Sequence, residues 1–372
     1  MFADITPILD SNLRYAHVEQ AGFAHDADAL TWRNRFGVQS RQGPFSGLIE
    51  FENVTALVQD YNSGLNGKTA YPQESDPQVT ELNRAQVTWT PDAHSALTVG
   101  RQRIILDDAR FVGNVGWRQD EQTFDAVRYD LKSGGFALTA AYLTKINRVL
   151  GEEKDWDSDS YILNAGYALH GVKLTAFDYA LDFANAAASS TLTLGARASG
   201  GFNLASVKVN LTGQYARQSD YRNNPAEFEL QESMLEVAAT YRIASFKINY
   251  ESLGGDGKVG FVTPLGTTHA FEGFADAFSG TGGNKTTANG LDDLNCAATL
   301  SLPHKSALTL IYHDLSTARL GVGLGHEWDA VATVGLTKHL SLLAKYADYD
   351  ASASPLAPAS RRKTWLALSY KL

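Results

Sequence analysis

The sequence predicts an all-β fold, a transmembrane antiparallel β-barrel of about eighteen strands. Three observations point to it. Apolar and polar residues alternate with a period of two along the whole chain, short and long connections alternate strictly, and no segment is apolar enough for a membrane-spanning helix. We therefore expect residues 1–372 to form one domain, with short periplasmic turns on one rim and longer extracellular loops on the other.

The composition fits such a barrel better than it fits a soluble protein or a helical membrane protein. Of the 372 residues, 44% are hydrophobic and 20% are charged. In a membrane barrel only the residues that face lipid need to be apolar, so every second residue of a strand can be polar. The net charge of −9 argues against nucleic acid as a partner, and the single cysteine, Cys296, excludes an internal disulfide.

Each expected strand has one apolar and one polar face. Between residues 207 and 215, Val209 and Leu211 alternate with Lys208 and Asn210. This period is that of a β-strand whose two faces meet different surroundings. The pattern predicts strands at residues 11–21, 29–41, 44–58, 79–90, 95–106, 121–132, 135–146, 158–169, 171–183, 190–199, 204–217, 232–243, 245–253, 294–302, 306–316, 322–336, 339–349 and 361–372.

The connections between these strands predict the two rims of the barrel. Short turns are expected at 42–43, 91–94, 133–134, 170–171, 200–203, 244, 303–305 and 338. Longer loops, rich in Asp, Asn, Gly and Pro, are expected at 59–78, 107–120, 147–157, 218–231, 254–293 and 350–360. A soluble propeller or solenoid is the alternative, but the chain shows no repeat of the length that those folds need.

The aromatic residues and the two ends of the chain agree with a protein of the bacterial outer membrane. Trp32, Trp89 and Tyr129 lie near strand ends, where a barrel in lipid carries its aromatic girdles. The last expected strand, 361–372, is an alternating apolar strand. The first residues have neither the basic region nor the apolar stretch of a signal peptide, which fits either a cytosolic protein or a mature form. Because the strand pattern predicts an outer-membrane barrel, we expect the mature form.

Several segments resemble a known family. They are FENV at 51–54, DYNSG at 60–64, GRQRI at 100–104, RFVGNVGWRQ at 110–119, EQTFDA at 121–126, HAFEGFAD at 269–276 and NGLDD at 289–293. Together they look like the bacterial alginate-export outer-membrane channel family. The resemblance implies a barrel of about eighteen strands and, in the members that export alginate, an arginine-lined pore for a polyanionic polysaccharide.

Basic residues in the first half of the chain are the candidate pore lining. They are Arg84, Arg101, Arg103, Arg110, Arg118, Arg128 and Lys145. Alternation turns Arg84 and Arg128 inward, and Arg101 and Arg103 share one face of the strand between them. Pairing the hairpins places Arg84 across from Arg101 and Lys145 near Arg103, with no acid between them on those strands. Such a wall would attract anions.

Two interpretations of these cations remain open. They could contact a passing solute, or they could be neutralised by an infolded loop that carries Asp107, Asp108, Asp120 and Glu121. A separate group, at residues 33, 35, 50 and 52, is expected to form two arginine–glutamate ion pairs between neighbouring strands. The loops at 107–120 and 254–293 are long enough to act as a lid or a plug.

The sequence offers no catalytic site, metal site or cofactor. The glycine-rich loop at 254–293 lacks the pattern of a phosphate-binding loop, and its acids lack the spacing of an EF-hand. His269 and Glu272 have no second histidine for zinc. No serine and histidine are placed to suggest a hydrolase. We therefore expect a protein that is not an enzyme.

The function predicted from these features is passive diffusion of small, anionic or sugar-acid-like solutes through an outer-membrane channel. The expected partners are outer-membrane lipid and the solute, and nucleic acid is not expected. One alternative is export of an anionic polysaccharide such as alginate with periplasmic partners. The chain is shorter than we expect for a polymer exporter, which favours small solutes. The other alternative is a closed barrel with adhesive or binding loops.

Overall fold

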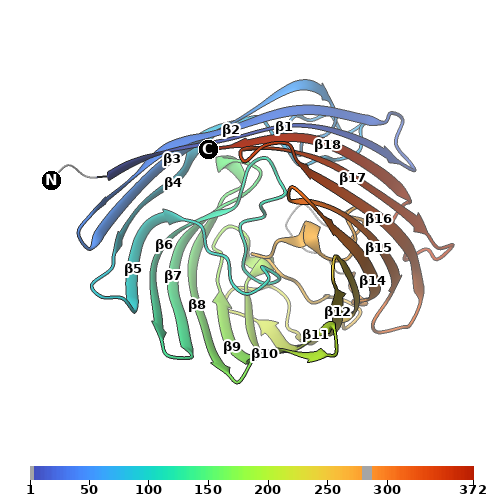
Figure 1. The fold of residues 1–372 in the computed structure, drawn as a ribbon. Coiled ribbons are helices and arrows are strands. Elements are labelled where there is room, and N and C mark those ends of the chain that lie inside the picture. Colours follow the sequence, from blue (N-terminus) through green and yellow to red (C-terminus); the bar gives the residue numbers. More distant parts are fainter. Residues whose placement is uncertain (1–3, 279–286) are drawn as a thin grey trace.

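The chain forms a single closed barrel of antiparallel strands (Figure 1). The computed structural model describes residues 4–278 and 287–372, and within them 18 strands form one sheet. Each strand pairs with its neighbours in sequence, and β1 pairs with β18 to close the ring. Closure leaves no open sheet edge, so the backbone groups within lipid are satisfied by neighbouring strands. The predicted fold class and strand number are confirmed.

The strands occupy nearly all the positions that the alternation predicted. Their bounds are β1 Asp4–Gln20, β2 Ala27–Gln42, β3 Phe45–Asp60, β4 Val79–Trp89, β5 Ser95–Gln102, β6 Thr123–Ser133, β7 Phe136–Asn147, β8 Trp156–Leu169, β9 Val172–Leu181, β10 Thr191–Leu204, β11 Val207–Asp220, β12 Glu229–Tyr241, β13 Ala244–Leu253, β14 Leu291–Leu302, β15 Ser306–Ser316, β16 Gly323–Gly335, β17 Leu340–Ala351 and β18 Arg361–Lys371. Short 3-10 helices lie at η1 Glu152–Lys154, η2 Ala187–Ser189 and η3 Thr268–Ala270. No helix in the described residues is long and apolar enough to cross a bilayer.

Short and long connections alternate around the barrel as predicted, but two turns lie elsewhere. The turn expected at 200–203 lies at 205–206, because β10 continues through two glycines to Leu204 and pairs with Val207. The turn expected at 244 lies at 242–243, between the paired residues Tyr241 and Ala244. Ala205 and Arg242 take positive φ values of 51°, as tight hairpin turns require.

The two faces of the sheet differ in character. Large apolar side chains are exposed on the outside, for example Leu235, Ile248 and Leu310. Charged side chains such as Arg35 and Glu52 are buried on the inside. An apolar band outside and a polar interior are the distribution that a barrel in lipid requires.

Two long loops fold into the barrel and meet there (Figure 1). The loop at 103–122, between β5 and β6, contacts the loop at 254–290, between β13 and β14. Val112 and Leu265 form a β-bridge, and Gly113 N–H donates to Leu265 O at 2.9 Å. Residues 279–286 of the second loop lie outside the described residues. Apolar side chains of both loops, including Phe111 and Phe261, pack in the core. The loops thus narrow the lumen.

Candidate functional site

Three of the cations predicted to form a basic wall lie in the barrel interior, each beside an acidic group. Arg84 on β4, Arg103 just after β5 and Arg128 on β6 contact groups of the barrel interior, and their side chains are 15%, 27% and 24% exposed. Side chains that are partly exposed in this way can donate hydrogen bonds to a solute in the lumen as well as to the protein.

Arg101 and Lys145 do not belong to this wall. Ala85, not Arg84, lies opposite Arg101, so alternation places Arg84 and Arg101 on opposite faces of the sheet. Arg101 instead pairs with Asp125, with 2.8 Å between Arg101 Nε and the carboxylate. Lys145 lies opposite Asp125 on the next strand. The expectation that Arg84 faces Arg101 was wrong, because the β4–β5 hairpin pairs Trp89 with Leu97 and so places Ala85 opposite Arg101.

The expectation that no acid lies among these cations was also wrong. Arg128 Nε is 2.8 Å from Asp130, which lies on the same strand. Arg84 contacts Glu50 at 2.7 Å, and Arg103 contacts Glu121. Arg35 pairs with Glu52 as expected, whereas Arg33 pairs with Asp10 and not with Glu50. A lattice of ion pairs therefore lines this side of the barrel.

The loop at 103–122 crosses the lumen and makes ion pairs with distant strands. Asp107 pairs with Lys173 on β9 and Asp108 with Arg197 on β10. Neutralisation of the first-half cations by Asp107 and Asp108 is therefore not what the structure shows. Glu121, by contrast, does neutralise cations of the first half of the chain. Burial opposes its charge, but Arg35 and Arg103 lower the pKa of Glu121 to about 2.

The two predicted arginines of this loop fasten it to the rest of the barrel. Arg110 is 2% exposed and contacts Glu251 at 2.5 Å and Glu272. Burial acts to lower the pKa of Arg110, but these two carboxylates outweigh it and raise the pKa. Arg118 contacts Glu74 at 3.2 Å and Asp276 at 3.0 Å. The loop is held between β13, the loop at 61–78 and the loop at 254–290.

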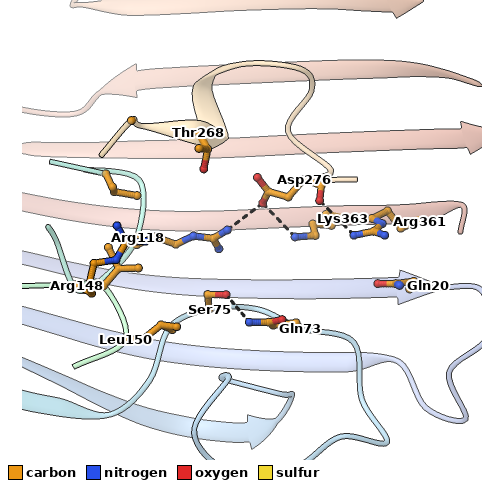
Figure 2. Close-up of a pocket in the computed structure, with 13 residues that line it drawn as sticks. Gln20, Gln73, Ser75, Arg118, Arg148, Leu150, Thr268, Asp276, Arg361 and Lys363 are labelled. Carbon is orange, nitrogen blue, oxygen red and sulfur yellow. Dashed lines mark hydrogen bonds and ion pairs between the residues drawn. The ribbon is translucent and has the colours of Figure 1, made fainter. Parts of the chain in front are cut away.

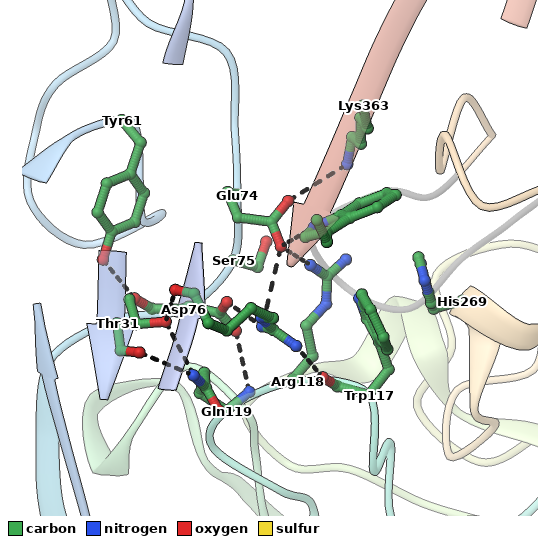
Figure 3. A network of polar contacts seen from close by, with 12 residues as sticks. Thr31, Tyr61, Glu74, Ser75, Asp76, Trp117, Arg118, Gln119, His269 and Lys363 are labelled. Carbon is green, nitrogen blue, oxygen red and sulfur yellow. Dashed lines mark hydrogen bonds and ion pairs between the residues drawn. The ribbon is translucent and has the colours of Figure 1, made fainter. Parts of the chain in front are cut away.

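A polar network surrounds the contact of Arg118 (Figure 3). Arg14 on β1 pairs with Asp76 and donates to the backbone oxygen of Trp117 at 2.5 Å. Gln119 N–H donates to Asp76 at 3.0 Å, and Tyr61 donates to the backbone oxygen of Asp76 at 2.6 Å. Burial opposes the charge of Asp76, but Arg14 and Arg118 lower its pKa. The carboxylate therefore orders the middle of the infolded loop.

A cavity opens where these loops reach the extracellular rim (Figure 2). It has a volume of about 710 Å³ including its opening to solvent. Its charged lining side chains are Arg118, Arg148, Arg361, Lys363 and Asp276. We call it the mouth cavity. Among the described residues that line it, four are cationic and one is anionic, so it is a basic site.

A histidine behind the mouth cavity is held in one protonation state. His269 stacks on Trp117, with ring centroids 4.6 Å apart. Its Nε2 accepts from Lys345 Nζ at 2.8 Å, and its Nδ1 lies 3.0 Å from Asp276. Burial lowers the pKa of His269 well below its usual value, and Asp276, which acts to raise it, only partly offsets this. A carboxylate accepts and an ammonium donates, which suits a neutral ring with its proton on Nδ1. Its Nδ1–H therefore donates to Asp276.

Sequence reasoning missed most of the mouth cavity. It did not single out Arg148, Arg361 or Lys363, and it considered Asp276 only as one of the acids of the loop at 254–293. The run at 361–363 at the start of β18 carried a signal, since alternation places Arg361 and Lys363 inward and Arg362 outward. Among the described residues, no group of three or more His, Cys, Asp or Glu side chains is placed to hold a metal ion.

Comparison with known proteins agrees with this architecture. The family model described as alginate export matches residues 13–231, more than half of the chain. OccAB2 of Acinetobacter baumannii has a TM-score of 0.73 and 17% identity over 99% of this chain and 98% of that chain. OpdK of Pseudomonas aeruginosa, solved with vanillate, has a TM-score of 0.72 and 15% identity over 98% of each chain. No curated protein matches the sequence.

Proposed function

The chain belongs to the alginate export family and forms a bacterial outer-membrane barrel, and on this basis we propose that it is a channel for passive diffusion of small anionic solutes. The observation that carries the proposal is the mouth cavity, where four cationic side chains face one carboxylate. An anion arriving from outside would be drawn to this surface and then meet the partly exposed side chains of Arg84, Arg103 and Arg128.

The infolded loops favour a small solute over a polymer. The loop at 103–122 is bound to β9, β10 and β13 by ion pairs, so it divides the lumen. Export of an anionic polysaccharide remains the second candidate because of the family match, and it would require this loop to leave the lumen. OpdK, a structural neighbour of the same fold, was solved with the carboxylate vanillate. This agrees with a small organic anion as the solute.

We assign no reaction to the protein. To pass an anion, the channel must attract it, offer an open path and bind it weakly. None of these steps makes or breaks a covalent bond. Which small anion passes depends on its shape as well as on its charge. The cations of the mouth cavity favour a solute with a negative charge.

The experiment that tests the proposal is the reversal potential of the purified protein in a planar bilayer under a potassium chloride gradient. We expect the sign of the reversal potential to show that chloride passes more readily than potassium. In the double variant with Arg361→Gln and Lys363→Gln, this preference should fall, because two of the cations that line the mouth cavity are removed. Arg362 supplies the matched control, since it points outward and pairs with Glu19 and Asp348.

Three outcomes separate the candidates. Anion preference that falls in the double variant and persists in Arg362→Gln supports the proposal. Cation preference in the unmodified protein would contradict it. Absence of any steady conductance would favour a closed barrel with binding loops, and block of the current by alginate chains, with no small-anion preference, would favour polymer export.

A further inference from the structure

Asp276 lies among the cations that line the mouth cavity (Figure 2). One of its oxygens accepts from Arg118 Nη2 at 3.0 Å and from Lys363 Nζ at 3.3 Å. The backbone oxygen of Asp276 accepts from Arg361 Nη1 at 3.3 Å. The same residue therefore meets three of the cations that make the cavity basic.

These contacts are those expected between a bound organic acid and its site. Carboxylates bind to guanidinium and ammonium groups through short, charge-assisted hydrogen bonds. A solute carboxylate that enters the mouth cavity meets Arg118 and Lys363 already bonded to Asp276. The solute carboxylate and Asp276 would therefore compete for the charge of the same two cations.

A second carboxylate holds the same two cations from the other side. Glu74 Oε1 is 3.2 Å from Arg118 Nη1, and Glu74 Oε2 is 3.6 Å from Lys363 Nζ. Glu74 is fully buried and does not line the cavity, whereas Asp276 does. Glu74 therefore holds Arg118 and Lys363 from the buried side (Figure 3), and Asp276 is the carboxylate on the side that a solute could reach.

We propose that Asp276 is an internal competitor for solute carboxylates and sets a low affinity at the mouth cavity. This inference rests on the proposed function. A channel must bind its solute strongly enough to admit it and weakly enough to release it. Competition from a tethered carboxylate gives weak binding while the cations that attract the solute are retained. The ligand class it implies is a small carboxylate such as a sugar acid.

The test compares block of the chloride current by glucuronate in the unmodified protein and in Asp276→Asn. The asparagine keeps the shape and the hydrogen-bonding oxygen but removes the charge, and Glu74 still pairs with both cations. We expect the half-blocking concentration of glucuronate to fall by roughly fivefold, the order of effect of one partly screened charge pair. Asp26→Asn is the matched control, because Asp26 is exposed near the same rim and does not line the mouth cavity.

A coupled variant shows where the effect arises. Adding Asp276→Asn to Lys363→Gln should raise glucuronate affinity less than Asp276→Asn does alone, since Lys363 is one of the two cations that the Asp276 carboxylate contacts. The reversal potential, measured on the same preparations, reports the proposed function separately. An anion-preferring channel whose glucuronate block is the same in Asp276→Asn as in the unmodified protein would overturn this inference and leave the function standing. An equal gain in glucuronate affinity in Asp276→Asn and in Asp26→Asn would also overturn this inference.

Folding of each variant is checked by the shift in gel mobility that an intact barrel shows without heating. If Asp276→Asn fails to fold, Asp276→Glu provides the second variant. Its longer side chain keeps the charge, so the half-blocking concentration should stay within roughly twofold of the original. A strong gain in affinity with Glu at 276 would contradict the role of the charge.

Discussion

Gly113 and Thr267, from two different loops, approach so closely that no side chain fits between them. A Cβ atom on Gly113 would have Thr267 Oγ1 as its nearest neighbour and would lie 2.7 Å from the Cβ of Ala109. Backbone hydrogen bonds join the loops on both sides, from Gly113 to Leu265 and from Thr267 to Ala109, each at 2.9 Å. The constriction of the lumen therefore depends on a glycine at this position.

The substitution Gly113→Ala should separate the two loops. We expect the free energy of unfolding to fall by about 1–3 kcal/mol, as is usual for overpacking, and the single-channel conductance to rise. Urea unfolding in liposomes, followed by tryptophan fluorescence, and bilayer recording measure the two effects. Gly47→Ala is the control, because no atom lies within 4 Å of its Cβ position. Unchanged conductance in Gly113→Ala would show that this contact does not set the width of the channel.

Arg110 should be the most important single anchor of the infolded loop. Arg110→Met removes the cation that contacts the buried side chains of Glu251 and Glu272. Loss of one partner from a buried pair typically costs about 3–5 kcal/mol, so a decrease of that size in the free energy of unfolding is expected. Arg217→Met, which removes an exposed pair with Glu229, should cost less than about 1 kcal/mol. Equal losses in the two variants would refute the anchoring role.

Selectivity should depend on which face of the sheet an arginine occupies. The double variant Arg103→Gln with Arg128→Gln removes two lumen cations and should shift the reversal potential toward zero. The matched pair Arg101→Gln with Lys145→Gln removes the same charge from residues that the register turns away from Arg84. Its reversal potential should remain close to that of the unmodified protein. A larger shift from the second pair would contradict the face assignment.

Asp120 should make stability depend on pH. Burial, then the nearby Glu81 and Glu52, raises the pKa of Asp120 well above its usual range. Because the folded-state pKa lies above the unfolded value, this contribution to stability is present below about pH 4 and is lost as the pH rises through the folded pKa. Asp120→Asn keeps the neutral form, so its advantage in free energy of unfolding should grow from pH 4 to pH 8.

Unfolding curves of the two proteins at several pH values measure this difference. Asp26→Asn is the control, since it removes a carboxylate that is exposed rather than buried. An advantage of Asp120→Asn that shrinks as the pH rises would show that Asp120 is ionised in the folded protein.

The strands could be predicted from the sequence because the membrane imposes a simple local rule. Residues such as Leu235 and Ile248 must face lipid while their neighbours face the lumen, so the period of two marks every strand. Errors arose where the rule fails locally. The glycines at 200 and 201 looked like a turn but lie within β10. The register of Arg101 was missed because a shift of one residue reverses the face.

The sequence by itself determined the barrel, the arrangement of its rims and the presence of many inward cations. Only the tertiary structure decided which acids neutralise those cations and which cations remain available. Arg118 meets Glu74 and Asp276 across 44 and 158 positions of the chain, and Lys363 joins the same pair from the last strand. Alternation is a property of neighbouring residues, whereas these contacts depend on how long loops fold into a shared lumen, and no local pattern encodes that.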